Sequence, residues 1–368
     1  MKSDELFFDY KLQHELQYKL TRRPYEERLF FKSILHCKQS VIPKANYRAV
    51  DVMTRRRGNT VKAHFANLYN CKSLWSCPTC AAYGLSQHRD KITAIIEHQR
   101  QRGYWACMIT YTVPHNNHES AATVFKRLKD MNQIVRPWQC LPHSAGSVTS
   151  TEFTYNDATG WHPHLHVLYF IPQTEWYKLT ESVNKLRGRV VSYFRSLGYA
   201  ETESMLNRCA RISVDNKGTP RKILNGDYVA KEMAKLKTGR RRFKSRTPFE
   251  LLLSDDPRDF YLFLEYATVT KGRSRIQYSN NIQKGMDVTA LNAKKNTSLG
   301  GELVETVVCT FTEQDWRNII EDELATHRRH RRRILICACM GFDRVVSYCL
   351  KFELPCPYPP MRQVVNAA

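Results

Sequence analysis

Apolar side chains recur along the chain with two periods, and each change of period predicts where a helix gives way to a strand. Residues 81–102 carry leucine and isoleucine at helical spacing, and Gly103 follows as a helix end. Residues 104–113 form an unbroken run rich in β-branched and aromatic side chains, which predicts a buried strand. Residues 120–135 return to the helical period, so this strand is expected between two helices.

A β-hairpin is predicted next. Residues 147–155 and 164–170 have strand patterns, and the Asn, Asp and Gly residues in 156–160 supply turn chemistry. Residues 174–197 follow with an apolar stripe at helical spacing, and a glycine closes the segment. This stripe predicts a long amphipathic helix with one buried face.

The remaining elements of the main domain are shorter. Residues 211–215 predict a strand, and residues 227–237 and 247–268 predict helices. The resulting order of strand, helix, hairpin, helix, strand and helix differs from the regular alternation of parallel β/α folds. The chain is therefore predicted to be an α+β protein whose antiparallel β-sheet is covered by helices.

Changes in composition divide the chain into five predicted parts. The stretch 292–301 is rich in Asn, Lys, Ser and Gly, which is typical of a linker. In chain order the parts are a variable N-terminal extension (1–35), a cysteine module with its helix (36–103), the main domain (104–291), the linker (292–301) and a small, basic, mostly helical domain (302–368).

The composition indicates a folded protein outside the membrane. Hydrophobic residues make up 42% of the 368 residues, which is too many for a mostly disordered chain. The longest apolar run, Ile334–Phe342, is much shorter than the roughly 20 residues that span a bilayer. The first 16 residues carry charges where a signal peptide needs an apolar stretch. We therefore expect a cytoplasmic protein with no membrane partner.

The charge predicts a polyanionic partner. The chain has 57 Lys and Arg against 35 Asp and Glu, a formal charge of +22, and nucleic acid is the commonest partner of such a surplus. Three basic stretches are candidates for contacts with phosphates, namely 55–57, 239–246 and 327–333. A solvated charged surface is the alternative for at least one of them.

The segment His162–His166, with the sequence HPHLH, is the most informative chemical signal in the main domain. Alternate residues of a strand point to one face, so the imidazoles of His164 and His166 are expected together, with His162 outside this pair. The hairpin can place Glu152 opposite them, and two imidazoles with a carboxylate suit Mg²⁺ or Mn²⁺ beside a phosphate, or Zn²⁺. A solvent-facing strand that carries histidines by chance is the alternative.

Residues 227–237 are predicted to expose a tyrosine beside charged groups. Helical spacing puts Tyr228, Lys231 and Glu232 on the polar face. Lys231 would lower the cost of a phenolate and Glu232 could move a proton, so Tyr228 is a candidate nucleophile. Attack on a phosphodiester also needs a cation on the non-bridging oxygens, which the histidine strand would supply. A surface tyrosine among ordinary Glu–Lys pairs is the alternative.

Four of the twelve cysteines are spaced for a metal. In a reducing compartment thiols are not expected to form disulfides. Cys77 and Cys80 form a CPxC knuckle, in which a turn lets two thiolates meet at one ion. Cys71 and Cys37 would complete a Cys₄ set for a structural Zn²⁺.

Alternatives to this cysteine site remain open. Buried thiols without a metal would have the same composition, and His36 and His88 are alternative fourth ligands. A second group of cysteines near the C-terminus has poor spacing for zinc. It consists of Cys337, Cys339, Cys349 and Cys356.

Several of these motifs occur together, in this order, in one group of nucleases. They are Thr110–Thr112 (TYT), Trp161–Leu168 (WHPHLHVL), Tyr228–Lys231 (YVAK), Arg246–Leu253 (RTPFELLL), Leu264–Tyr266 (LEY) and Lys271–Arg273 (KGR). The chain thereby resembles the HUH endonuclease superfamily, in particular the rolling-circle replication initiators (Rep proteins) of plasmids and phages. The similarity covers roughly residues 37–281, and similar Rep proteins carry an N-terminal cysteine module.

The resemblance implies an HUH nuclease core and a role for each candidate residue. His164, His166 and Glu152 would hold the catalytic Mg²⁺ or Mn²⁺, and Tyr228 would be the nucleophile with Lys231 as its helper. Attack on single-stranded origin DNA would leave a 5′-phosphotyrosine and a free 3′-OH that primes synthesis, and a later 3′-OH would rejoin the strand. Host DNA polymerase and a host helicase are the implied partners.

The chain departs from the family pattern at two positions. Some Rep proteins have a glutamate four residues before the tyrosine, where this chain has Leu224, and others have a second tyrosine where this chain has Glu232. We therefore expect a single-tyrosine nickase, with Glu232 as a candidate to activate water at termination. Tyr278 is the nearby alternative nucleophile, although its surroundings predict a strand aromatic. Rival functions are an HUH transposase or relaxase, or a zinc-containing DNA-binding regulator without catalysis.

Overall fold

The computed structural model describes residues 7–42, 47–136, 141, 143–200, 202, 209–214, 220–224, 245–282 and 304–360. The chain forms two compact units. Unit 1 contains residues 1–73, 77–80 and 288–368, and unit 2 contains residues 74–76 and 81–287. None of the helices in these described ranges is long and apolar enough to cross a membrane.

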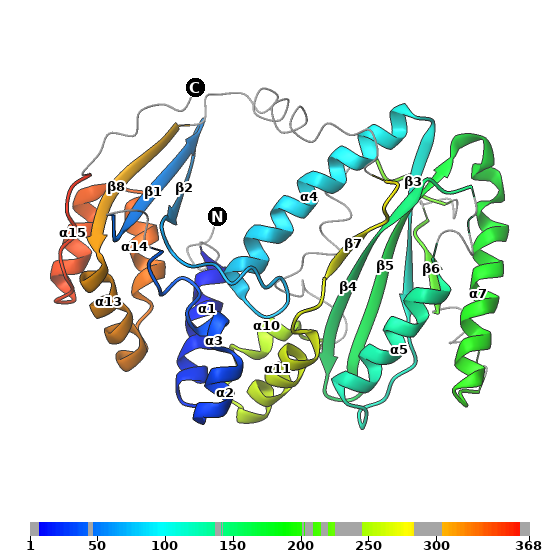
Figure 1. Cartoon of the computed structure of the whole chain (residues 1–368), viewed down its shortest axis with the longest axis horizontal. Coiled ribbons are helices and arrows are strands. Elements are labelled where there is room, and N and C mark those ends of the chain that lie inside the picture. The colour runs from blue at the N-terminus through cyan, green and yellow to red at the C-terminus, as the bar shows by residue number, and fades with distance from the viewer. Residues whose placement is uncertain are drawn as a thin grey trace. The chain divides into compact units, whose positions relative to one another are not determined.

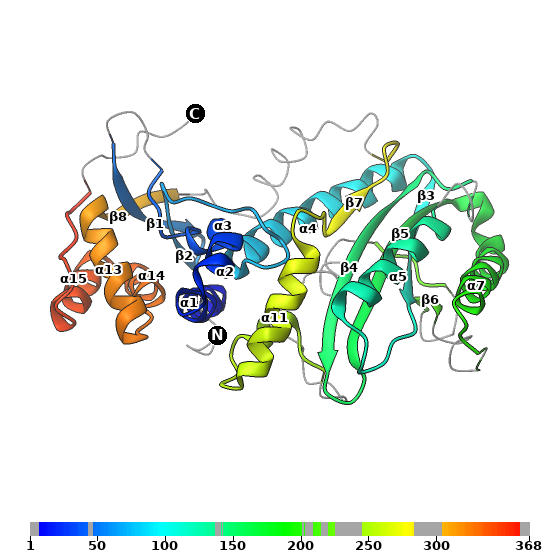
Figure 2. The same cartoon turned by 60° about the horizontal axis from the view of Figure 1, so that its bottom comes forward.

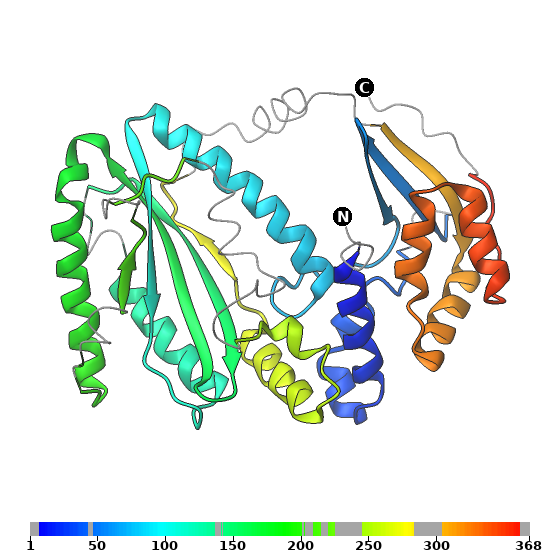
Figure 3. The same cartoon turned by 180° about the vertical axis from the view of Figure 1, so that it is seen from behind.

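Unit 1 is built on a three-stranded antiparallel sheet with the order β2-β1-β8. The strands are β1 (Ala49–Arg57), β2 (Thr60–Phe65) and β8 (Val304–Thr312). Figure 3 shows the three strands side by side, with three C-terminal helices beside β8. Because β8 comes from the far end of the sequence, the sheet joins the two ends of the chain within one unit.

Helices supply the rest of unit 1. They are α1 (Phe8–Thr21), α2 (Tyr25–Phe30), α3 (Lys32–Leu35), α13 (Glu313–Thr326), α14 (His330–Ala338) and α15 (Phe342–Lys351). The indole of Trp316 on α13 is fully buried and packs edge-on against Phe65 of β2, with the ring centroids 4.8 Å apart. The capping box of Thr312 and Asp315 begins α13 directly at the end of β8.

Helix α1 belongs to the core of unit 1, whereas residues 1–35 were expected to be a variable extension. Leu12, Leu16 and Leu20 recur every fourth residue and are fully buried. The buried side chain of Gln17 donates to backbone carbonyl oxygens of the following segment. The polar composition of this segment therefore reflects polar residues that are buried with partners, which a composition argument cannot recognise.

The C-terminal segment also differs from the expected separate, mostly helical domain over 302–368. Strand β8 pairs with β1 from Ala49↔Thr312 to Arg56↔Val304, so this segment completes the sheet of the N-terminal part. The sequence of one strand shows its own alternation of apolar and polar residues but not which distant strand it pairs with. The pairing of β8 with β1 could therefore not be predicted from local patterns. The predicted linker, 292–301, lies outside the described residues.

Unit 2 is built on a five-stranded sheet with the order β6-β3-β5-β4-β7, in which all four pairs are antiparallel. The strands are β3 (Tyr104–Thr112), β4 (Gly146–Asn156), β5 (Gly160–Pro172), β6 (Ala210–Ile212) and β7 (Ile276–Tyr278). The predicted α+β class with an antiparallel sheet is confirmed. Strand β5 lies between β3 and β4, so on each face of the sheet its side chains have neighbours from both of these strands.

The β4–β5 hairpin was predicted and is longer than expected. The register pairs Asn156 with Gly160 at the turn and continues to Gly146 opposite Phe170. Gly160 has φ +76°, and a Cβ there would lie 2.6 Å from the carbonyl oxygen of Asn116. The turn therefore requires glycine both for its backbone conformation and for the close approach of the loop before α5.

The helices of unit 2 include α4 (Pro78–Gln101, of which the first three residues belong to unit 1), α5 (Ala121–Ile134), the 3₁₀ segment η2 (Gln173–Lys178), α7 (Leu179–Ser196), α10 (Pro248–Leu251) and α11 (Pro257–Thr270). Figures 1 and 2 show α5 lying across the sheet and α7 near its β6 edge. Leu128 of α5 and Leu186 of α7 share one core cluster with Val167 of β5. These two helices therefore cover one face of the sheet.

The predicted helix over 247–268 is divided into α10 and α11. The Thr247 hydroxyl and the Glu250 carboxylate form a capping box at the start of α10. The Asp256 carboxylate caps α11, and Pro257 occupies its first turn. Asp followed by Pro is a helix-start signal, and it accounts for the break inside the predicted element. The predicted helix over 227–237 lies outside the described residues.

Candidate active site and cysteine cluster

The histidines of β5 share one face of the unit 2 sheet. His162, His164 and His166 alternate with residues of the opposite face, where Leu165 and Val167 enter the core beneath α5 and α7. The apolar core therefore fixes which way the strand faces, and a slip of one residue would bury the histidines instead. His166 is buried, while His164 and His162 are partly exposed.

The neighbouring strands present polar side chains to the same face. His164 is paired with Thr112 of β3 and with Glu152 of β4, and His166 is paired with Thr110 of β3. Thr112 Oγ1 lies 3.0 Å from His164 Nδ1, and Thr110 Oγ1 lies 3.0 Å from His166 Nδ1. Each imidazole is thus oriented by a contact between its Nδ1 and a threonine hydroxyl. The two threonines are two residues apart on β3.

Glu152 and His166 meet at the centre of this face. His166 Nε2 lies 3.1 Å from Glu152 Oε2, and both residues are 4% exposed. Two adjacent ligands of one octahedral ion, with bonds of about 2.1 Å, stand roughly 3.0 Å apart. The pair therefore has the spacing of two ligands of one divalent ion, and imidazole with carboxylate suits Mn²⁺, Mg²⁺ or Zn²⁺. The ring centroids of His164 and His166 are 6.0 Å apart, and among the described residues His164 does not join Glu152 and His166 in a group of three converging ligand atoms.

A further histidine was missed in the sequence. His115 Nε2 lies 2.7 Å from His162 Nδ1, and His115 Nδ1 lies 3.0 Å from the carbonyl oxygen of Val113. Since a carbonyl only accepts, His115 Nδ1 carries a proton and His115 Nε2 accepts from His162. Burial lowers the pKa of His115, which favours this neutral ring. His115 lies in a loop after β3, where no spacing pattern connects it to the histidine strand.

Two residues quoted for the resemblance hold the histidine strand in place. The indole Nε1 of Trp161, at the start of β5, donates to Glu265 Oε2 at 2.9 Å. Glu265 Oε1 accepts from the backbone N–H of Ala121 at 2.7 Å, in the first turn of α5. Glu265 on α11 therefore links the histidine strand to the helix beneath it.

The candidate nucleophile and its helpers, Tyr228, Lys231 and Glu232, lie outside the described residues. The segment that leads to them is described as far as Leu224, whose side chain is 70% exposed. Ile223 is buried, and its N–H donates to the carbonyl oxygen of Ala106 on β3 at 2.8 Å. The last described contact of this segment with the sheet is therefore at Ile223, five residues before Tyr228.

The alternative nucleophile Tyr278 lies on the edge strand β7. Its hydroxyl is 2.7 Å from His88 Nδ1 of α4, and the Lys91 ammonium lies 4.4 Å from its ring centroid. Burial raises the pKa of Tyr278, so the phenolate is disfavoured there. The expected role as a strand aromatic is consistent with this environment.

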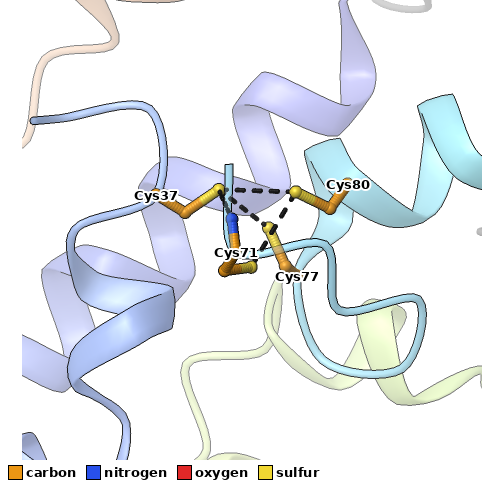
Figure 4. Close-up of side chains that lie close together, drawn as sticks. All are labelled: Cys37, Cys71, Cys77 and Cys80. Carbon is orange, nitrogen blue, oxygen red and sulfur yellow. Dashed lines mark hydrogen bonds between the residues drawn. The ribbon is translucent and has the colours of Figure 1, made fainter. Parts of the chain in front are cut away.

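The four predicted cysteines come together in unit 1 (Figure 4). Cys37 Sγ lies 3.5 Å from the sulfurs of both Cys77 and Cys80, and Cys71 Sγ lies 3.8 Å from Cys80 Sγ. The N–H of Cys71 donates to Cys37 Sγ at 3.4 Å. Hydrogen bonds from the other three thiols lower the pKa of Cys37, whereas burial raises that of Cys77.

These distances fit a zinc ion. A tetrahedral site with Zn–S bonds of about 2.3 Å places its sulfurs roughly 3.8 Å apart, close to the observed separations. Disulfide bonding would need a sulfur separation of about 2.05 Å. The donor set of four thiols and the N–H to sulfur contact are typical of a structural site, so this cluster can bind Zn²⁺.

The cluster is connected to the rest of unit 1 by hydrogen bonds. Cys77 Sγ lies 3.2 Å from Gln13 Oε1, to which it donates as a thiol in the absence of a metal, and Gln17 Nε2 donates to the carbonyl oxygen of Cys37 at 2.8 Å. The guanidinium of Arg331 on α14 donates to Gln17 Oε1 at 2.8 Å. Helix α1 therefore lies between the cysteine cluster and the C-terminal helices.

The alternative ligands are not part of this cluster. His36 Nδ1 lies 3.2 Å from the hydroxyl of Ser40, and His88 contacts Tyr278. Within the described ranges, the C-terminal cysteines form no group of three or more converging ligands. Cys349 is buried in the apolar core of unit 1, where burial raises its pKa to about 12.

Part of the basic stretch 327–333, which was expected to contact phosphates, is buried, whereas Arg328 and Arg333 are exposed. Arg331 is 1% exposed and its Nε donates to Glu323 Oε2 at 3.0 Å. Arg332 is also buried. Because the first turns of α14 face the core, this part of the arginine run holds unit 1 together. Within 239–246, only residues 245 and 246 are described, and Arg246 forms ion pairs with Asp157 and Asp259.

Comparison with known proteins gives two distant relatives. The chain is 26% identical over 136 residues to "Protein rep" of Streptomyces lividans, covering 28% of this chain and 30% of that protein. It is 23% identical over 134 residues to "Neomycin resistance protein" of Streptomyces cyanogenus, covering 28% of this chain and 31% of that protein. The chain thus spans less than a third of the length of these relatives. No family model and no solved structure matches the chain.

Proposed function

We propose that this chain is a rolling-circle replication initiator with an HUH nuclease core that nicks one strand of origin DNA. The observation that carries the proposal is the oriented face of β5. There His164 and His166 are each held through Nδ1 by a threonine, and His166 Nε2 faces Glu152 Oε2 at 3.1 Å. This donor set would hold Mg²⁺ or Mn²⁺, which supplies positive charge to the non-bridging oxygens of a phosphate.

The length of chain between the sheet and the candidate nucleophile is compatible with this proposal. Ile223 is bound to Ala106, four residues along β3 from Thr110. At about 3.3 Å per residue, these two strand positions are separated by roughly 13 Å. A chain of five residues spans a similar length, so Tyr228 can reach the histidine face if the chain turns back after Leu224, because the antiparallel bridge of Ile223 to Ala106 points it away from Thr110.

The proposed reaction is a transesterification. The Tyr228 oxygen bonds to phosphorus as the bond from phosphorus to the 3′ oxygen breaks, and the departing oxygen takes up a proton to become a 3′-OH. Lys231 stabilises the phenolate and contacts a phosphate oxygen. The phosphotyrosine conserves the energy of the phosphodiester, so a later 3′-OH can attack it and reverse the reaction.

Other features support the same function. The formal charge of +22 suits a nucleic-acid partner, and one distant relative is named "Protein rep". In this proposal the Zn²⁺ bound by Cys37, Cys71, Cys77 and Cys80 is structural. Extension of the free 3′-OH requires a DNA polymerase of the host, and strand displacement requires a host helicase. Both steps would take place in the cytoplasm. Glu232 would activate water at termination.

A covalent-capture assay tests the proposal. Labelled single strands that tile the genetic element encoding the protein are incubated with wild type and with Tyr228→Phe, in Mn²⁺ or in EDTA, and separated on a denaturing gel. We expect a label at the size of the protein only with wild type and Mn²⁺, because both the nucleophile and the ion are required. Tyr278→Phe is the matched control and should form the adduct normally.

The same assay separates the rival functions. Salt-sensitive DNA binding without an adduct on any strand would replace the nickase by a DNA-binding regulator. An adduct that forms only at the ends of a mobile element would favour a transposase, and one at a transfer origin would favour a relaxase. Normal termination by Glu232→Ala would remove the proposed role of Glu232.

A further inference from the structure

Unit 1 contains a second group of metal-ligating side chains, distinct from the cysteine cluster. His14 and Glu15 lie on α1, and His327 follows the last turn of α13. One donor atom of each residue lies within 4.8 Å of the donor atoms of the other two. His14 and Glu15 are buried, whereas His327 is exposed.

His14 has one ring nitrogen without a partner. Its Nδ1 lies 2.9 Å from Glu323 Oε1, and the other carboxylate oxygen of Glu323 accepts from Arg331 Nε at 3.0 Å. Because this carboxylate is an acceptor, His14 Nδ1 carries the proton and Nε2 of the neutral ring carries a lone pair. Among the described residues, the buried Nε2 has no hydrogen-bond partner. A buried polar atom without a partner is costly, so the lone pair calls for a ligand.

The other two side chains are also held in ways that metal ligands require. His327 Nε2 donates to Glu15 Oε2 at 3.1 Å, so a zinc ion bound to both would displace this proton, and Glu15 Oε1 accepts from Arg329 Nη2 at 2.7 Å. Metal-binding histidines usually donate their second nitrogen to a carboxylate, and metal-binding carboxylates are themselves hydrogen-bonded. Glu323 behind His14 and Arg329 behind Glu15 form such an outer layer.

We propose that His14, Glu15 and His327 form a second zinc site, with a remaining position open to water. Two imidazoles and one carboxylate are a ligand set that Zn²⁺ accepts. The rings of His14 and His327 are stacked, with centroids 5.0 Å apart and planes 23° from parallel. The His327 ring also stacks on Tyr18, with the ring centroids 3.8 Å apart.

The bound ion would cross-link two distant parts of unit 1. It joins α1, near the N-terminus, to the end of α13 through residues 14 and 327. An ion that bridges positions so far apart restricts the unfolded chain and is bound only by the folded unit. Zinc should therefore raise the thermal stability of unit 1 beyond the contribution of the cysteine cluster. This inference is independent of the proposed nuclease activity.

Zinc content per chain tests the site. The full chain carries His164→Ala and His166→Ala in every sample, so that the candidate active site does not contribute zinc. After zinc loading and gel filtration, mass spectrometry of the metal is expected to give two equivalents, one for the cysteines and one for this site. His327→Asn should lose one equivalent, and asparagine is chosen because residue 327 has φ +59°.

Two further variants complete the experiment. His118→Asn, an exposed histidine of unit 2, is the matched control and should retain both equivalents. Glu15→Gln keeps the shape of the carboxylate and should weaken the second equivalent at least tenfold, because the amide has no charge. The equivalent held by the cysteines reports that each variant is folded. Equal zinc content, and an equal rise in Tm on zinc addition, in His327→Asn and His118→Asn would overturn the site.

Discussion

The two units place their candidate metal ligands in opposite ways. In unit 1 the four cysteines are distributed over residues 37–80 and come from separate segments of the chain. In unit 2 His164 and His166 lie on one strand and their partners Thr112, Thr110 and Glu152 lie on the two adjacent strands, so the pairing of the strands sets their positions. We infer that a metal in unit 1 holds the fold, whereas a metal in unit 2 is held by a fold that stands without it.

Loss of the zinc cluster should have the largest effect. Structural zinc contributes about 10 kcal/mol or more to folding, so Cys77→Ser, or removal of zinc by a chelator, is expected to unfold unit 1. Hydrogen exchange would show lost protection in α1 and β1 with retained protection in β3 and β5. Cys356→Ser changes an exposed thiol and is the control. Equal protection in both variants would contradict a structural role for the cluster.

The buried arginine of unit 1 should have the next largest effect. Arg331→Met leaves the Glu323 carboxylate buried without its guanidinium, and breaking a buried pair in this way costs roughly 3–5 kcal/mol. Arg55→Met removes a partly exposed pair with Glu305 and should cost about 1 kcal/mol or less. Denaturant unfolding measures both values. A similar small loss for the two variants would mean that Arg331 is not needed to neutralise Glu323.

The same contrast explains what could be predicted from sequence. The hairpin, the strand β3 and the helix α5 follow from local alternation, turn residues and an N-cap, and their predicted bounds agree within a few residues with the structure. The pair Cys77 and Cys80 follows from the CPxC spacing because these two ligands are local, whereas Cys37 joins them from 40 residues away. The hairpin predicted Glu152 opposite His164 or His166, and the register of the structure pairs it with His164.

Long-range relationships could not be predicted. Three features depend on contacts between segments that are distant in sequence. They are the pairing of β8 with β1, the burial of Arg331 and the contact of His115 with His162. The local sequence pattern of one segment gives no information about its distant partner. The basic run 327–333 and the polar helix α1 have the composition of exposed segments. Their buried charges are compensated by partners such as Glu323, which lies in a different helix from Arg331.

Loss of a candidate active-site ligand should affect activity far more than stability. His166→Ala is expected to reduce adduct formation by roughly 10²–10³-fold, because charge stabilisation at the scissile phosphate is lost. The free energy of unfolding should fall by only about 1–2 kcal/mol, for the lost hydrogen bonds. Single-turnover cleavage and denaturant unfolding give the two values, with His118→Ala as the control. A large loss of stability with modest loss of activity would make His166 a structural residue.

The smallest predicted effect concerns the orientation of the ligands. Thr110→Val preserves the shape of a strand residue but removes the hydroxyl that lies 3.0 Å from His166 Nδ1. Partners of this kind contribute about 10-fold to 100-fold in metal affinity, so a higher Mn²⁺ concentration should be needed for half-maximal adduct formation. The rate at saturating Mn²⁺ should recover, since the ligands themselves remain. Thr149→Val, on β4, is the matched control and should not change the Mn²⁺ requirement. An unchanged Mn²⁺ requirement in Thr110→Val would mean that the strand alone orients the imidazole of His166. The site in unit 2 would then depend on strand pairing and not on hydrogen bonds to its ligands, which would sharpen its difference from the cysteine cluster of unit 1.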